Sequence, residues 1–277
     1  MKMVSHTNGK IKTVALSKDE IHTGNLILVN QLYPYKANIS GKMLNQIEDD
    51  VLLERQFAVA YEQVIEAINA HESIVAVSGW RAEQEQEQIY NDSLAANGKE
   101  FTSKYVALPG HSEHQTGLAV DVAYKQTNID CLRPHFPSDG ICEDFRIKAR
   151  YFGLIERYPK DKENITGIAY EPWHFRYVGA PHALIMQDTG DTLEEYHERL
   201  KNYRYGASPL KYDFGNSKIE ISYLEANGGT VFEAQGKSTG KVGDFGNETC
   251  AVLEIENDAI YTVSGNNIDG FIITMWK

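Results

Sequence analysis

Helical and extended patterns alternate along the first 205 residues without the regular strand–helix–strand order that a parallel sheet requires. Three apolar or β-branched runs predict strands: SIVAVSGWR at 73–81, LAVDVAY at 118–124 and PWHFRYVG at 172–179. Another apolar run, Leu26–Asn30, is expected to enter the core as a strand or an extended arm. This pattern predicts an α+β fold in which mixed helices surround a small antiparallel sheet.

Four segments have a helical pattern. The longest covers residues 43–71, where apolar residues recur at a spacing near 3.6, and this predicts an amphipathic helix in one or two pieces. Its apolar positions are Leu44, Ile47, Val51, Phe57, Tyr61, Val64, Ile65 and Ile68. Shorter helices are expected at 82–97 and 145–152, and a helix or helix pair is expected at 184–203.

The composition of the chain changes near residue 207. From there to Lys277, short runs of strand character such as KIEISYLEA, CAVLEIEN and GFIITMWK are separated by glycine and asparagine. Regular turn signals between such runs predict a small all-β module. We therefore expect two domains, an α+β domain over residues 1–206 and a β-rich module over residues 207–277, and no catalytic set of residues is apparent in the second.

Composition narrows the range of partners. Apolar residues make up 42% of the 277 residues, so the chain can bury a core. The formal charge of −12 argues against nucleic acid or an anionic membrane surface as the main partner, because both favour a basic protein surface. No apolar run approaches the roughly 18 residues that a membrane span needs. The sequence leaves the oligomeric state open.

The N-terminal segment contains no apolar run of signal-peptide length, so the protein is expected to be cytoplasmic. An exported protein whose leader has been removed would look the same, and this alternative stays open. Three cysteines are too few for a disulfide scaffold. Without an export signal, Cys131 and Cys142 are expected to be free thiols rather than a disulfide pair.

The stretch GHSEHQTGLAVDV crowds polar residues directly before a strand. Strand alternation places Asp121 between two alanines on one face, where the small neighbours leave room around its carboxylate. A buried carboxylate needs a cation or several donors. His114 lies seven residues earlier, beyond Gly117, where the chain can fold back to the same pocket. Two interpretations fit this pair: a structural His–Asp hydrogen bond at a strand edge, or part of a metal site.

A second segment, EPWHFRY, favours the metal site. Pro172 is expected to mark the start of a strand, with Glu171 just outside it and His174 directed into the site. Two neutral imidazoles and one carboxylate suit catalytic Zn²⁺, which keeps a fourth position for water. A nearby glutamate can take a proton from that water, whose pKa the metal lowers. The helical His-Glu-x-x-His motif of other zinc peptidases is absent, because His197-Glu198 lacks the second histidine.

The order and spacing of SGWR, SEHQTGLAVD and EPWHFRY resemble the three signature blocks of the VanY-type D,D-carboxypeptidases and of their VanX and VanXY dipeptidase relatives. The form of the last block is more similar to VanY and VanXY than to VanX. The resemblance implies a Zn²⁺ ion held by His114, Asp121 and His174, with Glu171 as the general base. It also implies that Arg81 stabilises the oxyanion of the tetrahedral intermediate, a role that suits an always-charged planar guanidinium.

The same resemblance implies two residues that hold the terminal carboxylate of the substrate. In these families they are a serine two residues before the first histidine ligand and a glutamine after the arginine. Ser112 matches the serine. The run AEQEQEQ offers Gln84, Gln86 and Gln88 for the glutamine, of which Gln86 has the best spacing. The likeness spans about residues 25–206, and the β-rich tail departs from the compact family pattern.

Three functions are compatible with these features. The resemblance favours a zinc D,D-carboxypeptidase, which could also act as a D,D-dipeptidase, that removes D-alanine from D-Ala-D-Ala ends of peptidoglycan precursors and is associated with vancomycin resistance. One alternative is an L,D-carboxypeptidase or a peptidoglycan endopeptidase on the same scaffold. The other is a non-catalytic cell-wall binding protein with the tail as its adhesive module. Glu171 argues against the last function, because a binder needs no base beside its metal.

Overall fold

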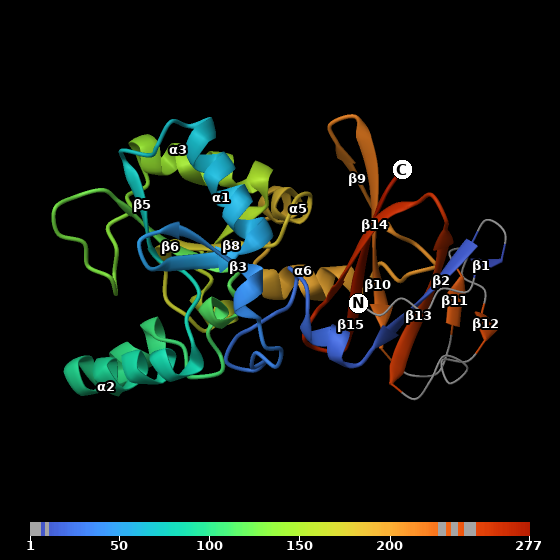
Figure 1. Ribbon diagram of the computed structural model, residues 1–277, viewed down its shortest axis with the longest axis horizontal. Helices are drawn as coiled ribbons and strands as arrows, with labels where there is room; N and C mark the ends of the chain where they lie inside the picture. Colours follow the sequence, from blue (N-terminus) through green and yellow to red (C-terminus); the bar gives the residue numbers. More distant parts are fainter. Residues whose placement is uncertain (1–6, 9–10, 227–230, 234–237, 241–247) are drawn as a thin grey trace. The chain divides into compact units, whose positions relative to one another are not determined.

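The computed structural model describes residues 7–8, 11–226, 231–233, 238–240 and 248–277 of the chain. It forms two compact units, which we call the central unit and the terminal unit (Figure 1). The central unit is Val29–Glu194, and the terminal unit combines Met1–Leu28 with Glu195–Lys277. Among the described residues, no helix is both long and apolar enough to cross a membrane.

A four-stranded antiparallel sheet, in the order β5-β6-β8-β7, is the framework of the central unit. Its strands are β5 (Ile74–Ser78), β6 (Ala119–Tyr124), β7 (Leu154–Tyr158) and β8 (Glu171–Tyr177). The predicted α+β class with a small antiparallel sheet is confirmed, and β5, β6 and β8 are the three expected strands. The sequence did not reveal β7, because its residues LIERY include two charged side chains that interrupt the apolar pattern.

The core of the central unit lies between the sheet and two helices, α1 (Arg55–Ala67) and α3 (Gly140–Ala149) (Figure 1). Glu54 caps the start of α1, where its carboxylate accepts hydrogen bonds from the first free backbone N–H groups of the helix. Large apolar side chains from both helices and from the sheet interlock in this core: Phe57, Tyr61, Phe145 and Phe175. The opposite face of the sheet is therefore available for polar residues.

The prediction of a helix over residues 43–71 is wrong for its first part. Residues 44–54 form a hairpin of β3 (Leu44–Glu48) and β4 (Val51–Glu54), and only then does α1 begin. The turn contains Asp50 in the left-handed conformation, with φ of 61°. Aspartate tolerates this conformation better than most residues, so the chain reverses at a point where a helix would have continued.

The other expected helices are present with different limits. Helix α2 runs from Glu83 to Tyr105 and bends at Gly98, close to the end expected from the sequence. Helix α3 begins five residues earlier than expected and continues into the 3-10 helix η4 (Arg150–Phe152). The expected helix pair is α5 (His182–Thr189) and α6 (Leu193–Leu200). The remaining short helices are η1 (Asp19–His22), η2 (Gly41–Met43), η3 (Glu113–Thr116) and α4 (Glu163–Thr166).

The described residues of the terminal unit form two sheets, in the orders β1-β2-β13-β11-β12 and β14-β15-β10-β9. The strands are β1 (Thr7–Asn8), β2 (Ile11–Ser17), β9 (Leu210–Phe214), β10 (Ser217–Glu225), β11 (Val231–Glu233), β12 (Ser238–Gly240), β13 (Thr249–Glu256), β14 (Ile260–Gly265) and β15 (Gly270–Trp276). The all-β character expected for the tail is confirmed.

The division between the units differs from the boundary expected at residue 206. Strand β2 pairs with β13, so the N-terminal segment belongs to the same unit as the tail. Val14 and Leu16 of β2 are buried in the core of that unit beside Leu253. Local sequence patterns identify a strand but not its partner, and this pairing joins the two ends of the chain.

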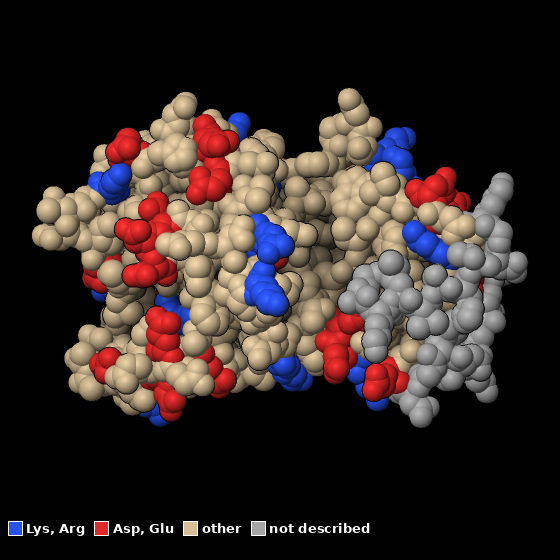
Figure 2. All heavy atoms as spheres, in the orientation of Figure 1, with Lys and Arg blue, Asp and Glu red and all other residues tan. Residues whose placement is uncertain are grey.

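Acidic and basic side chains are interspersed in small groups on the face of the molecule shown in Figure 2. The formal charge of −12 is therefore not concentrated in one field on the part of that face that the structure describes. The three cysteines are free thiols, with Cys131 exposed and Cys142 and Cys250 buried.

Candidate metal centre and active site

The pairing of β6 with β8 brings two of the expected ligands together. In the register of this antiparallel pair Asp121 lies opposite His174, and His174 Nδ1 is 2.9 Å from Asp121 Oδ1. Val120 and Val122 are buried in the core, so strand alternation directs Asp121 to the other face of the sheet. Both polar residues are nearly inaccessible, with exposed fractions of 7% for Asp121 and 4% for His174.

The short helix η3 delivers the third ligand, His114, to the same point. A capping box begins this helix and a glycine with φ of 72° ends it, which fixes the chain direction on both sides of the histidine. His114 Nδ1 donates to the carbonyl oxygen of Gly79 at 2.7 Å. Its Nε2 is then left with a lone pair, 3.2 Å from Asp121 Oδ2.

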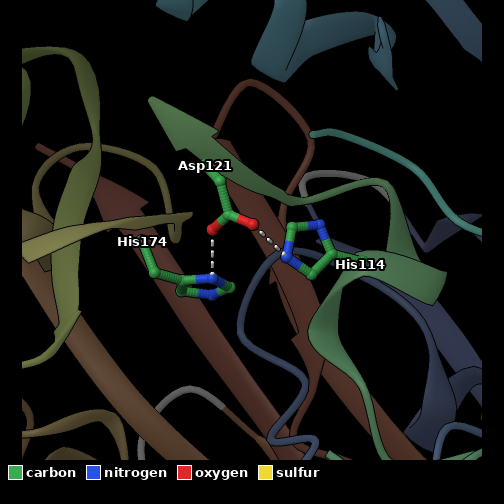
Figure 3. Close-up of side chains that lie close together, drawn as sticks. All are labelled: His114, Asp121 and His174. Carbon is green, nitrogen blue, oxygen red and sulfur yellow. Dashed lines mark hydrogen bonds and ion pairs between the residues drawn. The ribbon is translucent and has the colours of Figure 1, made fainter. Parts of the chain in front are cut away.

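These three side chains converge as a metal-ligand set (Figure 3). One ligand atom from each lies within 4.8 Å of the other two. Burial lowers the pKa of His114, which favours the neutral imidazole that binds metals. Although burial by itself would raise the pKa of Asp121, His114 and His174 hold it well below its ordinary value, so the carboxylate is ionised. Two imidazoles and one buried carboxylate fit Zn²⁺ in a catalytic site.

A cavity of about 220 Å³ opens beside the ligand set. Its lining includes all four remaining residues singled out from the sequence: Arg81, Gln86, Ser112 and Glu171. The structure therefore brings every predicted site residue to one place. Apolar side chains complete the wall, among them Ile89, Val106, Leu132, Ile168 and Trp173.

Arg81 lies three residues after the end of β5 and is held by two short hydrogen bonds. Its Nη2 donates to Ser78 Oγ and its Nη1 donates to Gln86 Oε1, each at 2.7 Å. Gln86 is buried on α2, and its Nε2 donates to the carbonyl oxygen of Ala107 at 2.8 Å. Gln84 and Gln88 are exposed, so helix geometry directs only Gln86 toward the cavity.

Glu171 is the first residue of β8, not a residue outside the strand as expected, and it pairs with Tyr158 of β7. Its side chain lies in the cavity, and the residue is buried with an exposed fraction of 7%. Burial raises the pKa of Glu171 to about 8, and the nearby Asp121 carboxylate adds to this effect. A carboxyl group with a pKa near neutrality is well matched to proton transfer.

Sequence reasoning missed Glu113, which lies between Ser112 and His114. Glu113 Oε1 accepts hydrogen bonds from Arg157 Nε and Arg176 Nη1, both at 2.8 Å, and all three side chains have an exposed fraction of 0%. Arg157 also donates to both carboxylate oxygens of Glu194, at 2.7 and 2.9 Å. The sequence contains one indication of this cluster. Strand alternation places Arg176 on the same face of β8 as His174, and a buried arginine beside a ligand needs an acidic partner.

Comparison with known proteins identifies the family. The family model described as VanY: D-alanyl-D-alanine carboxypeptidase matches residues 50–180. The bifunctional D-Ala-D-Ala dipeptidase and D-Ala-D-Ala carboxypeptidase VanXYC of Enterococcus gallinarum is 43% identical over 179 residues, which are 63% of this chain and 94% of that relative. The chain belongs to the VanY family.

Solved structures of VanY-family proteins and related enzymes agree with this assignment. The vancomycin resistance D,D-dipeptidase VanXYg, in complex with a D-Ala-D-Ala phosphinate analog, matches 97% of this chain and 100% of its own, with a TM-score of 0.86 and 43% identity. A mutant of the D,D-pentapeptidase VanY from a VanB-type resistance cassette, in complex with Zn(II), matches 62% of this chain and 98% of its own, with a TM-score of 0.52 and 31% identity. The LD-carboxypeptidase LdcB matches 62% of this chain and 84% of its own, with a TM-score of 0.53 and 34% identity.

Proposed function

We propose that this protein is a zinc-dependent D,D-carboxypeptidase that removes the terminal D-Ala from D-Ala-D-Ala-ended peptidoglycan precursors, with D,D-dipeptidase activity in addition. The observation that carries the proposal is the buried His114–Asp121–His174 set, which shares one cavity with Glu171 and Arg81. Similarity over nearly the whole chain to a D,D-dipeptidase of vancomycin resistance supports the substrate class. The same similarity supports a role in vancomycin resistance.

Each residue of the cavity has a chemical task in this proposal. Zinc, when bound, would polarise the scissile carbonyl and lower the pKa of a coordinated water. Glu171 accepts a proton at its buried carboxylate and returns it to the departing D-alanine amine. Arg81 presents a charged guanidinium, fixed by Ser78 and Gln86, to the oxygen on which negative charge develops.

The remaining cavity residues suit the end of the substrate. Ser112 offers a hydroxyl for the terminal carboxylate. The side-chain oxygen of Gln86 accepts a hydrogen bond from Arg81, and one of its two N–H groups donates to the Ala107 carbonyl oxygen. We propose that Gln86 positions Arg81 and donates its second N–H to the terminal carboxylate of the substrate. The apolar wall that includes Ile168 and Trp173 suits the small methyl side chains of D-alanine.

An L,D-carboxypeptidase on the same scaffold is the second candidate function. It is supported by the similarity to LdcB, an LD-carboxypeptidase with 34% identity. The D,D activity has the stronger support, because VanXYg matches a larger share of this chain at higher identity. A non-catalytic binding function has no use for Glu171 and Arg81 beside the metal ligands.

One assay separates these functions. Zinc-loaded protein would be incubated separately with D-Ala-D-Ala, with UDP-muramyl-pentapeptide and with the corresponding tetrapeptide, and the release of D-alanine would be measured. We expect release from the first two substrates, and loss of release after chelation or in Glu171→Gln, which should keep its zinc while kcat falls by about 10² to 10⁴. Release from the tetrapeptide alone would favour the L,D activity, and no release from any substrate would refute the proposal.

We also propose that the protein acts in the cytoplasm, where it would remove D-Ala-D-Ala ends before the precursors are exported. Three free thiols support this proposal, since oxidising compartments favour disulfides. Cell fractionation with an antibody against the protein tests it. Recovery with the cytoplasmic fraction is expected, and recovery from the cell exterior would contradict the proposal.

A further inference from the structure

Two buried polar atoms face each other beside the metal-ligand set and have no other hydrogen-bond partner among the residues that the structure describes. They are His174 Nε2 and Glu113 Oε2, which lie 3.5 Å apart. Leaving a buried donor or acceptor without a partner is costly, so each atom needs the other. The distance is about half an ångström longer than an ideal N–H···O hydrogen bond, and a small shift of the imidazole closes it.

The opposite nitrogen of the same ring belongs to the ligand set. His174 Nδ1 is directed at Asp121, as Figure 3 shows, while Nε2 lies on the far side of the ring. A neutral imidazole has one N–H and one lone pair, and the partner of one nitrogen decides which nitrogen binds a metal. In His114, Nδ1 donates its hydrogen to a backbone carbonyl oxygen, which leaves Nε2 to bind the metal. In His174, the carboxylate of Glu113 takes the place of that carbonyl oxygen and faces Nε2.

The Glu113 carboxylate is well suited to accept the proton of His174. Its other oxygen already accepts from Arg157 and Arg176, so the side chain cannot rotate without breaking both ion pairs. Paired with two guanidinium groups, this carboxylate is a fixed acceptor of hydrogen bonds.

We propose that Glu113 is a positioning residue of the metal centre: its Oε2 accepts the Nε2 proton of His174 and so fixes Nδ1 as the zinc-binding atom. Glu113 does not touch the reacting atoms. It acts through His174, and Arg157 and Arg176 hold it in place. Carboxylates that orient a metal-binding histidine in this way commonly change metal affinity by 10- to 100-fold.

A pair of isosteric variants tests the proposal by zinc affinity, measured in competition with a chromophoric chelator. Glu113→Gln removes the anion that faces His174. Glu194→Gln removes a carboxylate from the same arginine, Arg157, without facing the ligand set, and serves as the matched control. We expect both variants to lower the melting temperature, but only Glu113→Gln to weaken zinc binding, by about 10- to 100-fold. Equal losses of zinc affinity in the two variants, or unchanged affinity in Glu113→Gln, would overturn the proposal.

The wild-type protein provides a second measurement in case Glu113→Gln does not fold. Long-range ¹H–¹⁵N spectra of the zinc-loaded protein report which imidazole nitrogen carries the proton. We expect the proton of His174 on Nε2 and that of His114 on Nδ1. A His174 proton on Nδ1 would refute the assignment. The inference rests on the zinc site of the proposed function but not on its substrate, so a protein that shows this tautomer yet releases no D-alanine refutes the function alone.

Discussion

Glu171 illustrates how surroundings rather than residue type set the chemistry of this site. Burial raises its pKa to about 8, Asp121 and Glu113 act in the same direction, and His174 and Arg81 act against them. In the proposed reaction, a glutamate with an ordinary pKa would be a weaker base toward a water molecule. The buried position at the start of β8 corrects this, and it depends on how the sheet is assembled.

The raised pKa of Glu171 predicts a pH-dependent stability in the zinc-free protein. Between its ordinary pKa of 4.5 and the folded value of about 8, the folded state keeps a proton that the unfolded state has lost. Glu171 should therefore lower the free energy of unfolding as pH rises through this window, by at most about 1.4 kcal/mol per pH unit. Urea unfolding at pH 5 and pH 8.5 measures the effect.

Glu171→Gln is the matched control for this measurement, because it keeps the size of the side chain and cannot titrate. His174, with a pKa raised to about 9, titrates over an overlapping pH range and interacts with Glu171, so the difference between the two proteins measures Glu171 together with its effect on His174. The same pH dependence in wild type and variant would mean that Glu171 is not the group responsible.

Gln86 is predicted to matter because it holds Arg81. Gln86→Ala removes the acceptor of one guanidinium hydrogen bond, so Arg81 should lose its fixed orientation and kcat/KM should fall by about 10-fold or more. Gln84→Ala, in an exposed position of the same helix, is the control and should leave the kinetics unchanged. Steady-state hydrolysis of D-Ala-D-Ala measures both. Comparable losses in the two variants would show that a general effect on the helix is responsible.

Among the larger elements, the contact between the end of β5 and the β3–β4 hairpin determines where His114 lies. Gly79 directly follows β5, and its carbonyl oxygen accepts the Nδ1 hydrogen of His114. The next residue, Trp80, donates its backbone N–H to the Leu52 carbonyl of the hairpin at 2.6 Å. The hairpin that replaced the expected helix thus fixes one wall of the metal centre.

Gly79→Ala should damage both stability and metal binding. A Cβ at this position would collide with the Leu52 carbonyl oxygen and would lie 2.9 Å from Val51 Cγ1, so β4 and β5 must separate. We expect a loss of about 1–3 kcal/mol in the free energy of unfolding together with weaker zinc binding. Gly41→Ala, where a Cβ meets open space, is the control. Chemical denaturation and chelator competition check both effects, and normal zinc affinity in Gly79→Ala would contradict this account.

In the whole molecule, the metal centre is contained in one of two units. All seven predicted site residues lie in the central unit, and the terminal unit has its own core. The family model matches residues 50–180, which lie inside the central unit, so the terminal unit is outside the matched segment.

This division predicts the outcome of two truncations. Residues 29–200, which retain α6 whole, should fold, bind zinc and release D-alanine from D-Ala-D-Ala. Residues 1–206 should be aggregation-prone, because β2 loses β13 and exposes Val14 and Leu16. Solubility, zinc content and D-alanine release measure the difference. A soluble, zinc-loaded 29–200 fragment without activity would show that the terminal unit contributes to catalysis.

The residues of the metal centre could be predicted from the sequence because each clue is local. His114 and Asp121 lie seven residues apart around a glycine turn, and Glu171 and His174 lie three apart on one strand. Strand alternation then assigns Asp121 to the face opposite the core. The candidate ligands and the neighbouring acid could therefore be singled out from short-range pattern and from the resemblance that it supports, and the structure brings them together.

Only the tertiary structure decided which distant segments meet. Residues 44–54 satisfy a helical and a hairpin pattern alike, and packing against Gly79 favours the hairpin. Strand β2 pairs with β13 of the tail, whereas the boundary expected at residue 206 groups residues 11–17 with the α+β domain, because a local pattern does not report the partner of a segment. The pKa of Glu171 and the contact between Glu113 and His174 arise from burial and from pairing across the sheet. These properties belong to groups far apart in the chain, so no local pattern records them.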